Sequence, residues 1–161
     1  MKVLIAIDGS SAALDGVHWA LRQAADGLAL EVVLLNVQEP ASLYEVVTAH
    51  DTEVIDAVRR SAGADLLQGA EALLQAAGRD FESEVAGGVP QHLITELAEN
   101  YGCDAIVVGA RGLGSPESAG LGSVALGVLT EATVPVVVVR PAAADLAESG
   151  EPADDADAAA P

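Results

Sequence analysis

Aromatic and sulfur-bearing side chains are scarce in this chain of 161 residues. Phe, Trp and Tyr make up 2% of it, and it has one Cys and one Met, although 51% of the residues are hydrophobic. A core must therefore be built from Val, Leu, Ile and Ala. The single cysteine, Cys103, excludes a disulfide within the chain and fits a reducing compartment. The length predicts a single domain with one sizeable core.

Long hydrophobic runs are also missing. No apolar run approaches the ~18 residues of a membrane-spanning helix. The apolar run at the N-terminus meets a charge at Asp8, too early for the apolar core of a signal peptide. We therefore expect a cytoplasmic protein.

Basic residues are few: 7 Lys and Arg stand against 25 Asp and Glu, which gives a formal net charge of −18. Such a surface repels phosphate backbones and anionic lipids, so we expect neither nucleic acid nor membrane as a partner. Either a salt-rich cytoplasm or a compositional bias toward Ala and Gly explains the depletion of lysine. Six of the acids follow residue 141: Asp145, Glu148, Glu151, Asp154, Asp155 and Asp157.

The hydrophobic pattern predicts strands that alternate with helices. Continuous apolar runs indicate strands over 2–8, 31–37, 81–86, 105–109 and 135–140. Helical periodicity indicates helices over 12–25, 53–77, 90–100 and 123–132, with a long loop over 38–51. This order predicts an α/β fold: a single doubly wound five-stranded parallel sheet with helices on both faces. Residues 1–141 form the domain, and the acidic tail 142–161 is expected to be disordered.

A glycine-rich segment follows the fourth expected strand. Gly109 and Gly112 precede Gly122-Ser123 with the spacing G-x2-G-x9-G-S, at the start of the last expected helix. Glycine permits close approach of the backbone to a ligand, and a helix N-terminus offers free N–H groups to anions. The spacing is neither that of the Walker loop nor that of the dinucleotide fingerprint. It favours a phosphate site, with turn formation as the alternative role of these glycines.

Two more residues reach the carboxyl edge of the expected sheet, where ligands of open parallel sheets bind. Asp8 ends the first expected strand and either accepts hydrogen bonds from a nucleotide or caps the next helix. Val37 ends the second and either offers its backbone to an adenine edge or belongs only to the core.

The chain resembles the universal stress protein family over residues 1–141. The resemblance lies in Val3-Leu-Ile-Ala-Ile-Asp-Gly-Ser10, Val89-Pro90, Cys103-Asp-Ala-Ile-Val-Val-Gly-Ala-Arg-Gly-Leu-Gly114, Leu121-Gly-Ser-Val124 and Val134-Pro-Val-Val-Val-Val-Arg-Pro141. In that family G-x2-G-x9-G-[ST] is the signature of ATP binding. The resemblance implies a fold like that of the adenine nucleotide alpha hydrolases.

The resemblance also implies how ATP would be bound. Asp8 and Val37 would take the adenosine part, and the glycine loop the ribose and phosphates through Gly109, Gly112, Gly122, Ser123 and Val124. Arg111 either contacts a phosphate or is solvated. Mg²⁺ or Mn²⁺ would bind through the phosphates and not through the protein, because His18, His50 and His92 share no ligand spacing with one another or with Cys103. Glu117 would lie near the phosphates and weaken binding.

The last expected strand predicts a partner. Four consecutive valines, Val136–Val139, flanked by prolines at the end of the domain are typical of an exposed edge strand, with a buried inner strand as the alternative. Family members commonly form homodimers through this strand. The resemblance implies an ATP-binding stress-response module. The alternatives are an ATP-independent dimer that acts by protein contacts and a slow ATPase, for which no general base is evident.

Overall fold

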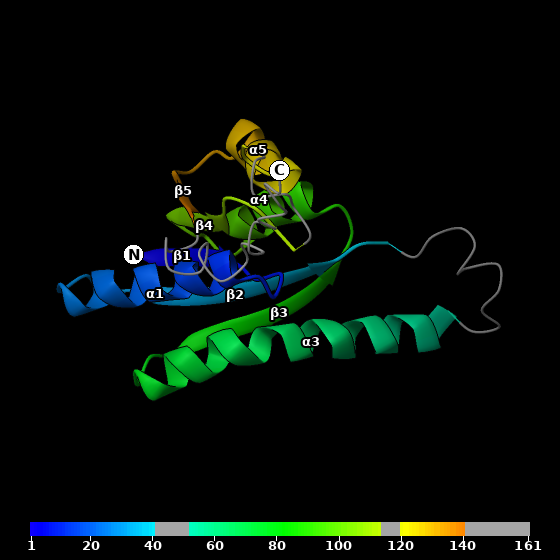
Figure 1. Ribbon diagram of the computed structural model, residues 1–161, viewed down its shortest axis with the longest axis horizontal. Coiled ribbons are helices and arrows are strands. Elements are labelled where there is room, and N and C mark those ends of the chain that lie inside the picture. The colour runs from blue at the N-terminus through cyan, green and yellow to red at the C-terminus, as the bar shows by residue number, and fades with distance from the viewer. Residues whose placement is uncertain (41–51, 114–119, 141–161) are drawn as a thin grey trace, which may run out of the picture.

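The computed structural model describes residues 1–40, 52–113 and 120–140. It contains one sheet of five strands, all parallel, in the order β3-β2-β1-β4-β5 (Figure 1). The strands are β1 Lys2–Ala6, β2 Glu31–Gln38, β3 Phe81–Gly87, β4 Ala105–Gly109 and β5 Val136–Val139. The helices are α1 Ser11–Ala25, α3 Thr52–Ala76, α4 Pro90–Asn100 and α5 Ser123–Glu131. The predicted fold class is confirmed.

Helices cover both faces of the sheet, which explains why the inner strands are apolar without alternation. Two hydrophobic clusters fill the space between sheet and helices. On one face α1 and α3 pack through residues such as Val17 and Leu74, and on the other α4 and α5 pack through Ile94 and Val128 (Figure 1). As expected, Val, Leu, Ile and Ala make up nearly all of this core.

The chain order reverses between β1, the central strand of the sheet, and its neighbour β4. From β1 the chain winds outward to β2 and β3, and it then returns to β4 and β5 on the other side. The loops that leave β1 and β4 therefore diverge at the carboxyl edge and leave a crevice between them.

The first strand is shorter than predicted, because β1 ends at Ala6 and not at Asp8. The Ile7 N–H still donates to the Leu35 carbonyl at 2.8 Å, whereas Asp8 turns out of the ladder to bind the backbone of the following loop. The last strand is also shorter, because the Pro135 peptide has no N–H and Arg140 lies beyond the strand. Its position at one edge of the sheet agrees with the sequence prediction.

Several sequence predictions lie outside the described residues: most of the loop 38–51 with His50, the loop residue Glu117, and the acidic tail. Within the described ranges, no helix combines the length and the apolar character needed to cross a membrane.

Candidate functional site

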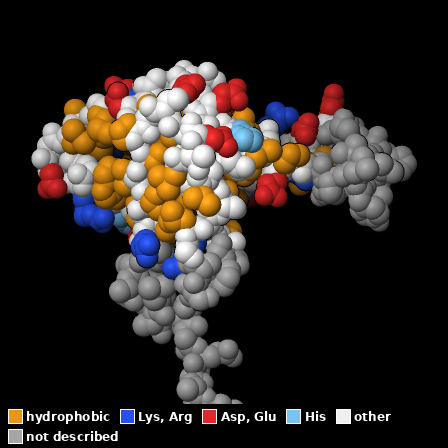
Figure 2. Space-filling view, turned by 90° about the horizontal axis from the view of Figure 1, so that it is seen from above, with side chains coloured by type: hydrophobic (Ala, Val, Ile, Leu, Met, Phe, Trp, Pro, Cys, Tyr) orange, Lys and Arg blue, Asp and Glu red, His pale blue; other side chains and the backbone are white. Residues whose placement is uncertain are grey.

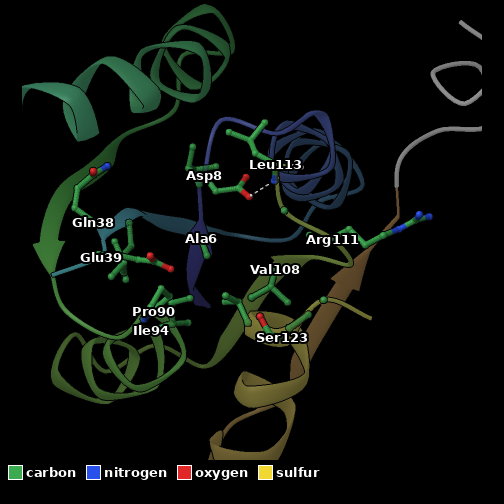
Figure 3. A pocket seen from close by; sticks show the side chains of 18 of the residues that line it. Ala6, Asp8, Gln38, Glu39, Pro90, Ile94, Val108, Arg111, Leu113 and Ser123 are labelled. Carbon is green, nitrogen blue, oxygen red and sulfur yellow. Dashed lines mark hydrogen bonds between the residues drawn. The ribbon is translucent and has the colours of Figure 1, made fainter. Parts of the chain in front are cut away.

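A pocket of about 1000 Å³ opens at the carboxyl edge of the sheet, at the point where the chain order reverses (Figure 3). The ends of β1, β2 and β4 form its floor, and the N-termini of α4 and α5 and the first turns of α3 form its walls. The structure brings all eight residues singled out from the sequence into its lining: Asp8, Val37, Gly109, Arg111, Gly112, Gly122, Ser123 and Val124.

Asp8 joins the two loops that diverge from the centre of the sheet. One carboxylate oxygen, Oδ1, accepts hydrogen bonds from the Ser10 N–H at 2.9 Å and the Ser10 hydroxyl at 2.6 Å. The other, Oδ2, accepts from the Leu113 N–H in the glycine loop at 3.3 Å (Figure 3). The cap of α1 is Ser10, whose Oγ accepts from the Ala13 N–H at 3.2 Å. Asp8 is therefore not itself the helix cap, and its carboxylate positions the loop beside the pocket.

Two glycines of the loop, Gly109 and Gly112, stand where a side chain would crowd its neighbours. A Cβ on Gly112 would lie 2.7 Å from Asp8 Oδ2, and one on Gly109 would lie 3.1 Å from the Ala12 Cβ. Neither residue needs a positive φ. Close approach, and not an unusual backbone conformation, is the reason for glycine at these two positions.

The N-terminus of α5 is open toward the pocket. Its N-cap residue is Gly122, which makes no side-chain capping bond, and the first turn carries no acidic residue. The free N–H groups and the positive end of the helix dipole therefore remain available to an anion. The exposed Ser123 adds a hydroxyl at the same place (Figure 3). The Gly122 N–H donates to the Ala110 carbonyl at 2.8 Å, which fixes this end of the loop to the end of β4.

Val37 is half-buried and packs against the cluster beneath α4 and α5 while it also lines the pocket. Its side chain thus belongs to the core, as one of the two interpretations of the sequence held. Because the end of this strand also lines the pocket, the other interpretation, in which the Val37 backbone binds an adenine edge, is compatible with the structure.

The charges that line the pocket balance one another, in contrast with the net charge of −18 for the chain. Asp8 and Glu39 are acidic, and Arg59 and Arg111 are basic. An anionic ligand therefore does not meet an excess of acidic side chains among the described residues of the lining.

Sequence reasoning missed the contribution of α3 and of the residues after β2. Val54 and Val58 are 58% and 63% exposed and line the pocket together with Ile55, instead of packing on the sheet. Their helical spacing was recognised in the sequence, but it did not show that α3 runs past the sheet. Gln38 and Glu39 also line the pocket, although the sequence assigned them to a loop.

The remaining candidate ligands lie apart from the pocket. His18 is exposed on α1, Cys103 is buried beneath α4, and His92 Nδ1 lies 2.6 Å from Glu131 Oε2. Burial raises the pKa of the Cys103 thiol, which disfavours the reactive thiolate. Across the described part of the chain, no three His, Cys, Asp or Glu side chains are grouped to hold a metal ion.

The chain matches the model of the universal stress protein family over residues 1–140. The chain belongs to this family. Universal stress protein YxiE of Bacillus subtilis is 36% identical over 146 residues, which cover 86% of this chain and 98% of the relative. Universal stress protein MJ0531 of Methanocaldococcus jannaschii is 30% identical over 139 residues, 86% of this chain and 81% of the relative.

Solved structures share the fold of this universal stress protein. Hypothetical protein MJ0577 aligns with a TM-score of 0.73 and 25% identity over 86% of this chain and 94% of its own. A universal stress protein solved in complex with cAMP aligns with a TM-score of 0.65 and 26% identity, over 88% of this chain and 98% of its own. A family protein from Arabidopsis thaliana with AMP bound aligns with a TM-score of 0.66 over 98% of this chain and 99% of its own. At 22% identity this likeness concerns the fold alone.

Proposed function

We propose that this universal stress protein binds ATP in the pocket at the carboxyl edge of its sheet and acts in the cytoplasm as a nucleotide-dependent module of the stress response. The observation that carries the proposal is the uncapped N-terminus of α5, where Gly122 and Ser123 border the pocket at the carboxyl edge of the sheet. The solved relative with bound cAMP, at 26% identity, supports an adenine nucleotide as the ligand class.

The phosphates would bind at α5, where the N–H groups of the first turn and the Ser123 hydroxyl point into the pocket. The base would lie toward the end of β2, beside the backbone of Val37 and the apolar side chains of Pro90 and Ile94. A Mg²⁺ or Mn²⁺ ion would be held mainly by phosphate oxygens, since such hard cations often bind through substrate phosphates.

We expect binding rather than turnover to be the main activity. The Asp8 carboxylate already accepts hydrogen bonds from three donors, two of Ser10 and one of Leu113, so it is poorly placed to take a proton from water. Nucleotide occupancy would instead order the glycine loop and alter the surface offered to partner proteins.

Calorimetric titration with ATP and Mg²⁺, at low and at high salt, tests the proposal, with Gly122→Val as the decisive variant. A Cβ at Gly122 would meet the Ala110 carbonyl and Arg111 at an ordinary 3.5 Å, so we expect the variant to fold. The branched side chain would nevertheless occupy the space before the first turn of α5. We predict one site per chain in the wild type and no measurable binding in the variant.

Gly120→Val is the matched control, because a Cβ there would have no atom within 4 Å. This variant should bind ATP as the wild type does. Equal affinity in Gly122→Val and in the wild type would remove the loop from the site, and absence of binding in the wild type at both salt concentrations would overturn the proposed function.

We further propose that the protein is a homodimer joined through β5, Val136–Val139. One side of this strand pairs with β4, and the other side is an edge of the sheet. The preceding helix, α5, also carries exposed apolar side chains, with Leu126 at 56% and Leu129 at 43%. Figure 2, which views the molecule from the α5 side, shows hydrophobic side chains gathered on this face.

A further inference from the structure

We propose that Glu39 selects the base of the bound nucleotide, by accepting a hydrogen bond from the 6-amino group of adenine and rejecting purines with an oxygen at that position. This inference rests on the proposed function, because it assigns one more residue of the same pocket. It concerns a side chain that the glycine signature does not include.

Glu39 follows β2 directly, and its side chain projects into the pocket. Figure 3 shows the carboxylate pointing from the end of β2 toward the middle of the cavity, across from Ser123 and near Pro90 and Ile94. Among the residues that the structure describes, no hydrogen bond or ion pair engages this carboxylate.

The backbone that carries Glu39 is held from both sides. The Gly88 N–H, at the end of β3, donates to the Gln38 carbonyl at 2.9 Å. The Arg59 guanidinium, on α3, donates to the Glu39 carbonyl. These contacts fix the main chain at residues 38 and 39, so the Glu39 side chain extends from an anchored position although it is itself exposed.

The other polar side chains of this end of the pocket are already engaged. Gln38 Nε2 donates to Asn36 Oδ1 at 2.6 Å, and the Asn36 amide in turn donates to the Ile7 carbonyl at 2.7 Å. The Asp8 carboxylate accepts hydrogen bonds from Ser10 and Leu113. Glu39 is thus the acidic lining residue whose oxygens face the space that the base would occupy.

The hydrogen-bonding chemistry of the Glu39 carboxylate favours adenine over purines that carry an oxygen at position 6. An ionised carboxylate only accepts hydrogen bonds. On the edge that carries N7, adenine offers the 6-amino donor, whereas hypoxanthine and guanine offer only the acceptors O6 and N7, so we place Glu39 at this edge and away from the N1–H donor of those two bases. Two acceptors facing one another leave both without a donor, and a site built around a hydrogen bond rejects such an analogue strongly. Because Glu39 is exposed and water competes, we expect ATP to be preferred over ITP by about tenfold, far below the limit for a buried site.

The test is calorimetric titration of the full chain with ATP and with ITP, which differ in the purine ring at position 6. The decisive variant is Glu39→Gln, because a glutamine amide rotates to offer either its oxygen or its N–H₂ group. We expect the preference of about tenfold in the wild type to fall to less than about threefold in the variant, mainly through tighter binding of ITP.

Glu96→Gln on α4 is the matched control. Glu96 is exposed, is not among the residues that line the pocket, and loses the same charge on substitution. The ratio of affinities should stay at the wild-type value in this control, although both nucleotides bind slightly more tightly to a less acidic protein.

The outcomes separate the two proposals. Binding of ATP and ITP with equal affinity by the wild type, or an unchanged ratio in Glu39→Gln, would overturn the role of Glu39 and leave the nucleotide site intact. Failure of the wild type to bind either nucleotide would overturn the proposed function and this inference together.

Discussion

At the scale of single residues, the contact between Asp8 and the glycine loop connects the neighbouring strands β1 and β4 beyond the sheet. Asp8 follows β1 and Leu113 follows β4, and their hydrogen bond spans 105 positions of sequence. Gly112 lies beside this bond, and only the absence of a side chain leaves space for the carboxylate. The loop is therefore held in place by one acidic residue and one glycine.

Gly112→Ala should weaken nucleotide binding by about tenfold, which corresponds to roughly one hydrogen bond of 1.4 kcal/mol. The added methyl group would lie 2.7 Å from Asp8 Oδ2, so the carboxylate must move away from the Leu113 N–H. Titration with ATP measures the change. Gly120→Ala is the control, since it meets no atom within 4 Å, and equal affinities in the two variants would contradict the argument.

Tyr101, at the end of α4, lies outside the pocket and reports on the stability of the fold. Its hydroxyl donates a hydrogen bond to Glu84 on β3, and this bond, followed by burial and by the charges of Glu84 and Glu82, raises the pKa of Tyr101 to about 12 from 10.0. The folded state therefore favours the neutral phenol.

The stabilisation by Tyr101 should be fully present below about pH 10 and disappear as the pH rises through about 12. We predict that the difference in urea midpoint between the wild type and Tyr101→Phe is constant up to pH 10 and shrinks between pH 10 and 12. Urea unfolding of both proteins across this range measures it. A difference that stays constant to pH 12 would show that the phenol ionises equally well in the folded and unfolded chains.

The residues of the glycine loop could be predicted because they form a short contiguous pattern between a strand and a helix. The second role of Asp8 could not, because Leu113 reaches it only through the pairing of β1 with β4. Glu39 and Arg59 were missed for the same reason. The Arg59 guanidinium reaches the Glu39 carbonyl only because α3 packs beside β2, and the spacing of residues in the sequence does not predict such a contact.

At the scale of elements, the long helix α3 contains two glycines with opposite surroundings. Its 25 residues run through both without interruption, although glycine inside a helix lowers the stability of that helix. A Cβ on Gly63 would lie 2.4 Å from Val85 Cγ1 and 2.7 Å from Asn36 Oδ1. A Cβ on Gly69 would meet only the two methyl groups of Leu14, at 3.6 and 4.0 Å. Gly63 is therefore required by close packing of the helix on β2 and β3.

The two glycines make a matched pair for substitution. Gly69→Ala should leave stability unchanged or raise it by up to about 1 kcal/mol, because alanine favours the helix. Gly63→Ala should lower stability by about 1–3 kcal/mol, since overpacking outweighs the gain in propensity. The urea midpoint of each variant measures its change in stability, provided that the dependence of unfolding free energy on urea concentration is unchanged. Similar changes in the two variants would contradict the packing argument.

The bounds of the elements could be predicted closely wherever a glycine, a proline or a cap marks them. The helix over 90–100 and the strand over 105–109 agree with α4 and β4 residue for residue. Periodicity identified the apolar stripe of α3, but it did not show which part faces the core. Leu67 and Leu74 lie against the sheet, whereas Val54 and Val58 extend past it and border the pocket. That division depends on the length of the neighbouring strands.

At the scale of the whole molecule, β5 is the edge strand through which we propose that two copies join. The Pro135 carbonyl accepts a hydrogen bond from the Ile106 N–H within β4, and the Val139 carbonyl accepts one from the Ala110 N–H directly after β4. Backbone groups alternate in direction along a strand, so those of Val136 and Val138 face away from the sheet. They are free to pair with the same strand of a second copy around a two-fold axis.

We predict a dimer in light scattering at micromolar concentration and a monomer for Val138→Pro. Proline removes one outward N–H group and leaves the ladder to β4 in place. Far-UV circular dichroism and ATP titration serve as controls, and both should match the wild type because the pocket does not include β5. A monomeric wild type would end the dimer proposal.

The central place of β1 has a consequence for the newly made chain. β1 can pair with β2 as soon as residue 38 has been synthesised, but its other side waits for β4, which ends at Gly109. At ribosomal rates of about 5–20 residues per second, this interval lasts roughly 4–14 seconds. During that time one edge of β1, whose residues Val3, Leu4 and Ile5 are fully buried in the finished fold, stays open, so the nascent chain is most prone to aggregate before its fourth strand emerges.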